Sequence, residues 1–359
     1  MFSSSRNVLK IVLATALVAG LSTAVARADG TETLGTPSID IATGTGFVAA
    51  GTGLVEQLGL IEFEVPAGEP IQQVLLYWTG EFHTDDDDTI EVDGVEITGT
   101  LIGGPTFFYT YQGSVSVSSY RADITDLGLV AAGANALEVA GLDYDHEDAG
   151  AGILVIYGEC GETETTSTCR HTWRNRRQCN NWHRGRCCGH TSESGEACAD
   201  IQVLDGIDIA FFRFAEPRRE TIAQTFTFEA ADVERVADLA LFTGSVEADR
   251  PNAILITVDG ETTEIIDLLG DSAGASWDAP TIPVDIPAGA TSLTVQIVST
   301  QNNDPLGASV VWVTAALAVP NPDGGDDDND NHCKRNRHRF RDWCGKKRFG
   351  NGWCRRGRR

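Results

Sequence analysis

Leu75-Leu76-Tyr77-Trp78-Thr79-Gly80 and Leu239-Ala240-Leu241-Phe242-Thr243-Gly244 are two versions of one stretch, and their repetition decides the fold. Each is followed by a Val-Asp-Gly turn and later by a closing apolar run. The turns are Val92–Gly94 and Val258–Gly260, and the runs are Ile153–Tyr157 and Val310–Val313. The offset between the copies stays near about 160 residues, as expected for a duplicated domain whose loops differ in length. The chain is therefore predicted to contain one domain twice.

Within each copy, apolar residues alternate with polar ones, which is the period of a half-buried β-strand. Ile61, Phe63 and Val65 show the alternation in the first copy, and Phe226 and Phe228 show it in the second. The run from Val74 to Trp78 is continuously apolar and predicts a strand that is covered on both faces. Many short strands separated by Pro, Gly and Asn indicate an all-β fold. We expect two tandem β-sandwiches of jelly-roll or immunoglobulin-like type.

Changes of composition divide the chain into segments. Residues 1–28 have the basic start, apolar core and A-x-A end of a secretory signal peptide, the alternative being an uncleaved membrane anchor. No other apolar run approaches the roughly 20 residues of a membrane span. The remaining segments are a lead-in at 29–59, the first sandwich at 60–215 with a Cys- and Arg-rich insertion at 160–198, the second sandwich at 216–319, an acidic linker at 320–332 and a basic tail at 333–359. This order predicts an exported protein, secreted or held at the cell surface.

The net charge of −25 conceals a strong asymmetry along the chain. The tail contains twelve Lys or Arg and a single acid, Asp342, whereas the two sandwiches without the insertion contain no Lys. An acidic body of this kind repels nucleic acid and anionic lipid, and it attracts divalent cations or basic partners. The tail has the opposite preference.

The body resembles a domain of unknown function found in secreted bacterial and archaeal surface proteins. The resemblance covers roughly residues 40–319 and is carried by Tyr120–Asp126, Gly150–Tyr157, Ile201–Gly206 and Ala275–Asp278 followed by Gly289–Ser292. It implies an extracellular β-rich module without known catalysis. Where the resemblance implies a short loop between Tyr157 and Ile201, this chain carries the Cys- and Arg-rich insertion.

All nine Cys lie outside the two repeats. In an exported chain they are candidates for disulfides: Cys160, Cys169, Cys179, Cys187, Cys188 and Cys198 in the insertion, and Cys333, Cys344 and Cys354 in the tail. The alternative for the insertion is zinc bound by Cys with His171, His183 or His190, although no C-x-x-C pair is present. Three tail Cys cannot pair completely among themselves. One of them reaches the insertion, links to another molecule to give a disulfide-linked oligomer, or stays free.

Two features of the body carry catalytic alternatives. Gly270–Gly274 matches the G-x-S-x-G pattern of serine hydrolases, with Ser272 as the nucleophile. The sequence after Ser272 does not favour the helix that this chemistry needs, so we expect a loop. His83 and His146, the only histidines of the body, stand beside acidic loops, where a His–Asp pairing is the alternative to exposed polar loops. The sequence therefore predicts a protein that is not an enzyme.

Acidic loops are candidates for Ca²⁺, which prefers oxygen ligands. The run Asp85, Asp86, Asp87 and Asp88 is the predicted site, although it lacks the spacing of an EF-hand loop. The alternative is a loop of solvated acids.

The tail combines cationic and aromatic side chains and is the predicted attachment segment. Its candidate binding residues are Arg335, Arg337, Arg339, Arg341, Trp343, Lys346, Lys347, Trp353, Arg355 and Arg356. Such a segment can dock on an acidic protein surface, either of its own chain or of a neighbouring copy, or bind an anionic envelope polymer or lipid head group. A third interpretation is a sorting signal that is removed during export.

These observations favour an exported structural or adhesive cell-surface protein without enzymatic activity, attached through its basic tail and its disulfide-stapled insertion. The first alternative is a Ca²⁺-dependent carbohydrate-binding module that uses the acidic loops and an exposed aromatic residue. The second is a serine hydrolase that uses Ser272. Fold alone does not choose among them.

Overall fold

The computed structural model describes residues 26–27, 32–160, 198–212, 218–248, 250–300 and 309–321. These residues form β-strands and one short 3-10 helix, η1 (Thr125–Leu127). The prediction of an all-β fold of sandwich type is confirmed. Among the described residues, no helix has the length and apolar character that a membrane crossing requires.

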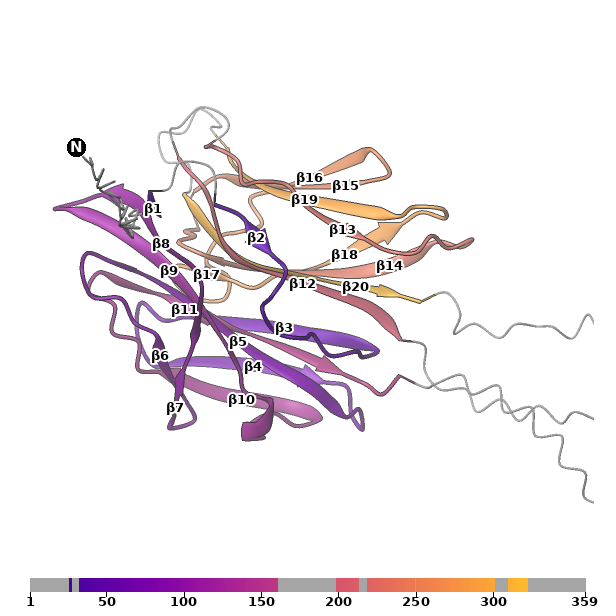
Figure 1. The fold of residues 1–359 in the computed structure, drawn as a ribbon, viewed down its shortest axis with the longest axis horizontal. Coiled ribbons are helices and arrows are strands. Elements are labelled where there is room, and N and C mark those ends of the chain that lie inside the picture. The colour runs from indigo at the N-terminus through magenta and orange to yellow at the C-terminus, as the bar shows by residue number, and fades with distance from the viewer. Residues whose placement is uncertain are drawn as a thin grey trace, which may run out of the picture.

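Four sheets are stacked in four layers (Figure 1). The first sandwich consists of an inner sheet and an outer sheet. The inner sheet has the order β1 (Ala26–Arg27), β8 (Thr100–Thr110), β9 (Ser114–Asp123), β5 (Ile71–Phe82), β11 (Glu147–Tyr157) and β3 (Gly46–Gly53). The outer sheet has the order β4 (Gly59–Val65), β10 (Gly133–Ala140), β6 (Thr89–Val92) and β7 (Val95–Thr98).

The second sandwich is built in the same way. Its inner sheet has the order β17 (Trp277–Asp278), β14 (Arg235–Gly244), β20 (Val310–Pro320), β12 (Ala199–Ala210) and β2 (Leu34–Gly35), and β18 (Thr281–Ile286) also pairs with β14. Its outer sheet has the order β13 (Gln224–Thr227), β19 (Ser292–Ser299), β15 (Asn252–Val258) and β16 (Glu261–Ile266). The two repeated stretches form β5 and β14, and each pairs antiparallel with its closing run, in β11 and β20.

Two matching hairpins come from the repeated Val-Asp-Gly turns. β6 and β7 are joined through Asp93 and Gly94, and β15 and β16 through Asp259 and Gly260. All four turn residues have positive φ, between 49° and 80°. This is the geometry of a two-residue turn whose twist matches the flanking strands, and Gly adopts it without strain.

The structure corrects the predicted domain boundaries. β12 lies within the predicted first sandwich (60–215), yet it pairs with β20 of the second sandwich. β3 lies in the predicted lead-in (29–59), yet it pairs with β11 as an edge strand of the first sandwich. β3 therefore belongs to the first sandwich and β12 to the second. The insertion at 160–198 consequently lies between the sandwiches rather than within the first one.

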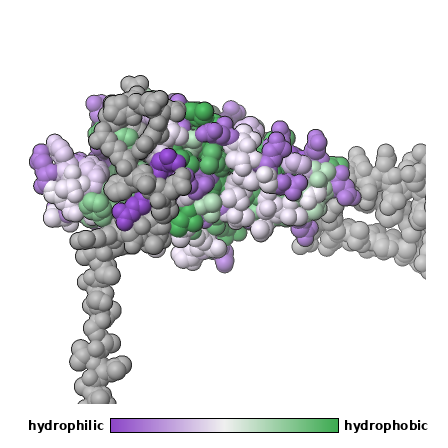
Figure 2. Space-filling model, turned by 90° about the horizontal axis from the view of Figure 1, so that it is seen from above, coloured by the Kyte–Doolittle hydropathy of each residue, from purple (hydrophilic) through white to green (hydrophobic). Residues whose placement is uncertain are grey.

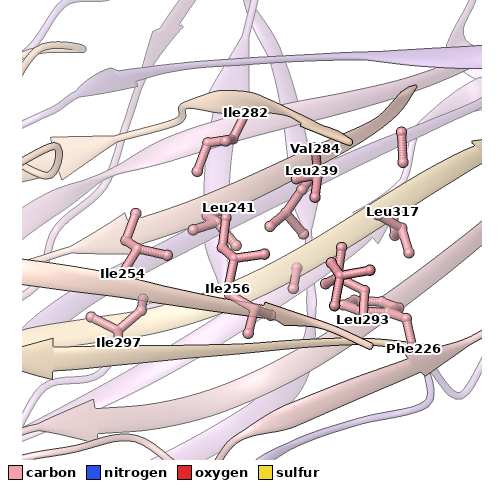
Figure 3. Packing of buried hydrophobic residues seen from close by; sticks show 14 of the residues in the cluster. Phe226, Leu239, Leu241, Ile254, Ile256, Ile282, Val284, Leu293, Ile297 and Leu317 are labelled. Carbon is pink, nitrogen blue, oxygen red and sulfur yellow. The ribbon is translucent and has the colours of Figure 1, made fainter. Parts of the chain in front are cut away.

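The layers follow from the burial of the strands. Strands of the outer sheets such as β13 alternate between buried and exposed residues, because one face meets water. Inner strands such as β5 and β20 are buried almost throughout, so the prediction for Val74–Trp78 is confirmed. Each sandwich has its own apolar core. Figure 3 shows the core of the second one, where Leu239, Leu241, Ile254 and Leu293 from the two sheets pack together.

A third core lies between the two inner sheets. Leu75 and Tyr77 of β5 contribute to it from one side, and Phe242 and Val313 from the other. The ring centroids of Tyr77 and Phe242 are 5.7 Å apart. A buried ion pair between Arg121 of β9 and Asp205 of β12 also joins the sandwiches. The two sandwiches thus share a continuous hydrophobic interface.

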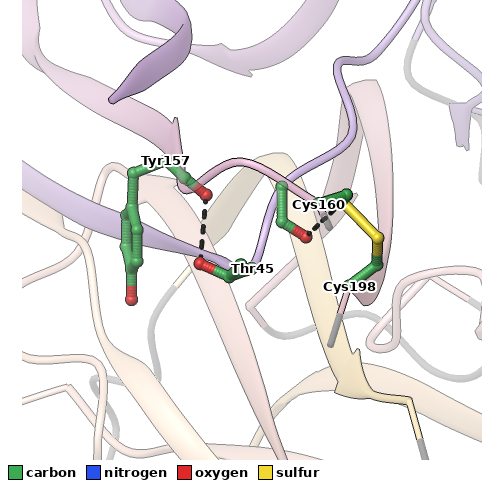
Figure 4. Close-up of a disulfide and its surroundings, with 5 residues drawn as sticks. Thr45, Tyr157, Cys160 and Cys198 are labelled. Carbon is green, nitrogen blue, oxygen red and sulfur yellow. Dashed lines mark hydrogen bonds between the residues drawn. A yellow bond between two sulfur atoms is a disulfide. The ribbon is translucent and has the colours of Figure 1, made fainter. Parts of the chain in front are cut away.

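A disulfide joins Cys160 and Cys198, which stand at the two ends of the insertion (Figure 4). The Sγ atom of Cys160 also lies 3.6 Å from the carbonyl oxygen of Gly44. The backbone N–H of Asn321, at the end of the described chain, donates to the carbonyl oxygen of Cys198 at 3.1 Å. Cys160, Cys198 and Asn321 therefore lie close together. The face shown in Figure 2 is mostly hydrophilic or neutral, with hydrophobic residues toward its middle.

Candidate functional site

Two glutamates lie side by side at one end of the first inner sheet. Glu81 is near the end of β5 and Glu147 begins β11, and they are direct partners in the antiparallel register of these strands. Directly opposed residues point to the same face of a sheet, about 5 Å apart at Cβ. That face meets the second sandwich, because Tyr77 of the same strand belongs to the core between the inner sheets.

Tyr109 of β8 connects Glu81 with a histidine. Its hydroxyl lies 2.8 Å from Oε2 of Glu81 and 2.8 Å from Nε2 of His146. Glu81 is only 2% exposed, whereas the side chain of His146 is 19% exposed. We call the group Glu81, His83, Tyr109, Tyr111, His146, Glu147 and Ser276 the junction site.

Further rings surround His146. The ring of His83 lies 4.9 Å from it, and the rings of Tyr109 and Tyr111 each lie 6.0 Å from it, measured between centroids. Tyr111 is 55% exposed. Rings that combine an apolar body with a polar edge are typical of binding surfaces.

The second sandwich completes the site. The hydroxyl of Ser276 donates to Oε1 of Glu147 at 2.5 Å. Ser276 has a φ of 64°, and Ser245, whose hydroxyl reaches Glu81, has a φ of 54°. Left-handed backbone is uncommon in residues other than Gly, and it clusters at functional sites. The junction site therefore requires both sandwiches in their observed arrangement.

Burial dominates the electrostatics of the site. Desolvation, and next the charge of Glu147, raise the pKa of Glu81 to about 7, although Tyr109, Ser245 and Arg250 favour its charged form. Burial and the nearby Glu81 also raise the pKa of Tyr109 above its usual range. Among the described residues, neither glutamate forms an ion pair with an Arg side chain. A buried acid with a strongly perturbed pKa is a candidate for a functional site.

The acidic loop at Asp85–Asp88 uses its carboxylates to hold neighbouring groups. Asp86 accepts from the hydroxyl of Ser118 at 2.9 Å, and Asp87 accepts from the backbone N–H of Asp143 at 2.7 Å. The carboxylate of Asp145 accepts from the backbone N–H of His83 at 2.6 Å, so it does not pair with the imidazole. No three His, Cys, Asp or Glu side chains are grouped to hold a metal ion in the described part of the chain. The predicted Ca²⁺ site at Asp85–Asp88 therefore gains no support.

Ser272 lies in a turn rather than in a nucleophile elbow. Its hydroxyl donates to Oδ1 of Asp278, which also accepts from the backbone N–H of Ala273 at 3.2 Å. The residues between β16 and β17 form turns, as the sequence predicted, and no helix follows Ser272. These hydrogen bonds stabilise the loop that contains Ser272.

Several predicted site residues lie outside the described residues. They are Cys169, Cys179, Cys187, Cys188, Cys333, Cys344 and Cys354, together with every binding candidate of the tail from Arg335 to Arg356. The disulfide prediction is confirmed for Cys160 and Cys198 alone. Attachment through the tail and the signal peptide both stay predictions.

Comparison with known proteins gives no family. No family model matches the chain, and no curated protein matches it. The resemblance to a secreted surface-protein domain therefore stays a prediction.

Solved structures offer only distant similarities. An exo-β-1,3-galactanase from Phanerochaete chrysosporium, solved with galactose, is 13% identical over 26% of this chain and 20% of its own, with a TM-score of 0.18. A cycloalternan-forming enzyme from Listeria monocytogenes, solved with a pentasaccharide substrate, is 11% identical over 73% of this chain and 19% of its own, with a TM-score of 0.22. The extracellular domain of ANXUR2 from Arabidopsis thaliana is 10% identical over 81% of this chain and 90% of its own, with a TM-score of 0.24. The chain spans about a fifth of the length of the two enzymes.

One prediction is corrected by these comparisons. The sequence was interpreted as that of a protein without enzymatic activity, yet the solved structures that it is similar to include two enzymes. The absence of activity is therefore no longer assigned to this chain. At such TM-scores, no activity or substrate is transferred to it either.

Proposed function

We propose that this is an exported protein that binds a saccharide at the junction site. The observation that carries the proposal is the group of partly exposed rings, from His83, Tyr109, Tyr111 and His146, beside the carboxylate of Glu147. A saccharide presents apolar ring faces and many hydroxyl groups. Tyrosine rings match the former, and carboxylate, imidazole and phenol groups exchange hydrogen bonds with the latter.

Binding sites often lie where two domains meet, with few polar groups in fixed positions among aromatic ones. The junction site has these properties, because Ser276 of the second sandwich donates to Glu147 of the first, and Ser245 of the second sandwich lowers the pKa of Glu81. Preorganised groups lower the entropy lost on binding. The proposal keeps the carbohydrate-binding alternative from the sequence but moves it away from the acidic loop and from Ca²⁺.

The test is a glycan array probed with the full chain, followed by calorimetry on the glycans that bind. Tyr111→Ala and Glu147→Gln should each lower the affinity at least tenfold, which corresponds to about 1.4 kcal/mol. Leu101→Ala, at the other end of β8, and Glu64→Gln, on the outer sheet, are exposed control variants that should leave the affinity unchanged. An array without a bound glycan, or binding that ignores both site variants, would refute the proposal. Loss of binding in a chelator would instead restore the Ca²⁺-dependent alternative.

A further inference from the structure

Glu81, Tyr109 and His146 form an unbroken hydrogen-bonded chain from the interior to the surface. The buried carboxyl lies at one end, the phenol is in the middle at 2.8 Å from each neighbour, and the imidazole is at the partly exposed end. We infer that this chain is a proton relay, through which the protonation of Glu81 decides whether Nδ1 of His146 donates or accepts a hydrogen bond toward a bound saccharide. The role toward a saccharide rests on the proposed function, whereas the relay itself does not.

The relay has two states in which every contact is satisfied. When Glu81 is protonated, its O–H donates to the oxygen of Tyr109, and the Tyr109 O–H donates to Nε2 of His146. The neutral imidazole then carries its proton on Nδ1. When Glu81 is ionised, Tyr109 donates to its carboxylate, and His146 donates from Nε2–H to the phenol oxygen. The neutral imidazole then has its lone pair on Nδ1.

The passage between these states moves three protons by one place each. The proton of Glu81 passes to Tyr109, the proton of Tyr109 passes to Nε2 of His146, and the proton on Nδ1 leaves to water or to a ligand. One proton is released and the site gains one negative charge, so the step balances. Tyr109 ends as a phenol, in agreement with burial raising its pKa above the usual range. Nδ1 of His146 has no hydrogen-bond partner within the described residues, which leaves it for a ligand.

The surroundings place the change near neutral pH. Burial raises the pKa of Glu81 to about 7, and the charge of Glu147 acts in the same direction. The groups that face the relay are His83 beyond β5, Tyr111 beyond β8, Glu147 on β11, and Ser245, Arg250 and Ser276 from the second sandwich. Arg250 and Ser245 favour the ionised state of Glu81, while burial and Glu147 favour the protonated state.

Other buried acids lack such a path. Burial also raises the pKa of Asp208 to about 7, but its carboxylate accepts from the backbone N–H groups of Ile209 at 2.8 Å and Ile222 at 2.7 Å. Asp205 pairs with Arg121. These acids hold backbone or a cation in place, whereas Glu81 is connected to a titratable group near the surface.

The test is the tautomer of His146, read from the ¹⁵N chemical shifts of both ring nitrogens in the full chain without ligand. In the wild type, Nδ1 should be protonated at pH 6.5, and the proton should move to Nε2 as the pH rises through about 7 to 8.5. Glu81→Gln and Tyr109→Phe should each abolish the movement. His83 is an internal control, because its Nδ1 lies 3.2 Å from the carbonyl oxygen of Ser114 and should stay protonated throughout.

A His146 tautomer that is independent of pH in the wild type would overturn the relay, even if both variants fail to fold. A movement that persists in Tyr109→Phe would also overturn it, because the phenol would then not carry the proton. The NMR measurement is made without a saccharide. It therefore tests the relay even if no glycan binds in the array. Conversely, a saccharide bound with unchanged affinity from pH 6.5 to 8.5 would refute the role of the relay in binding.

Discussion

Glu81 is the residue whose burial should make stability depend on pH. Its pKa is raised from the ordinary 4.5 to about 7, so the folded protein holds a proton that the unfolded chain has already lost in this window. The contribution of Glu81 to the free energy of unfolding should therefore be largest below pH 4.5, fall as the pH rises to about 7, and stay lower above it. The difference attributable to Glu81 is about 3 kcal/mol.

Glu81→Gln should remove this part of the pH dependence and make the variant more stable than the wild type at pH 8. Urea unfolding at pH 5 and pH 8 measures both quantities. Asp208 acts in the same direction, so some decline should persist in the variant. Glu64→Gln, on the exposed face of β4, should behave as the wild type does. A Glu81→Gln variant that is less stable than the wild type at pH 8 would contradict the assignment.

Only part of the site could be predicted from single residues. His83 and His146 were noted for their acidic neighbours, but the structure pairs their rings with each other and turns Asp145 to the backbone. Glu81 and Tyr109 carried no visible signal, because each lies in an ordinary strand pattern. The register between β5 and β11 brings Glu81 to Glu147, and such long-range pairing is not written in local sequence.

At the scale of elements, β14 shows why the repeated stretch is apolar throughout. Leu239 and Leu241 face the core of the second sandwich, whereas Phe242 faces the first sandwich. The ring of Phe242 lies 5.7 Å from that of Tyr77 and 6.1 Å from that of Trp277. Phe242→Ala should therefore lower the free energy of unfolding by about 3–5 kcal/mol, through the cavity it leaves between the sheets.

Chemical denaturation measures this loss, and Val95→Ala is the matched control in the edge strand β7. Val95 is exposed, so its truncation should change stability by less than about 0.5 kcal/mol. If Phe242→Ala lowered the free energy of unfolding by no more than Val95→Ala does, the inner sheets would not pack as described.

The elements that sequence reasoning missed are rich in glycine. Gly46–Gly53 was assigned to a lead-in because it lacks clear alternation, yet it forms β3. A Cβ atom at Gly51 would lie 2.3 Å from Nε1 of Trp277, and one at Gly53 would lie 2.3 Å from a backbone oxygen of Ala275. Glycine is required here by close approach of the second sandwich rather than by a loop. Composition alone does not separate these two causes.

At the scale of the whole molecule, the sequence predicted two sandwiches but not the core between them. The continuous apolar run of β5 predicted a strand buried on both faces. One face packs on the outer sheet of its own sandwich, and the other packs on the second sandwich. The ion pair of Arg121 and Asp205 is buried in the same interface. Removal of one partner of such a pair costs about 3–5 kcal/mol, because the other charge is left buried. Separation of the sandwiches would expose both the apolar side chains and this pair.

This shared core leads to a prediction about unfolding. If the second sandwich unfolded alone, Leu75 and Tyr77 of the first would lose their cover, and if the first unfolded alone, Val313 of the second would lose its cover. We therefore expect one transition in scanning calorimetry, with the calorimetric enthalpy equal to the van't Hoff enthalpy, as for a single cooperative unit. Two independent sandwiches would instead give two transitions, each with a smaller enthalpy. Because Ser245 and Ser276 reach Glu81 and Glu147 only across this interface, the second outcome would also remove the basis of the junction site.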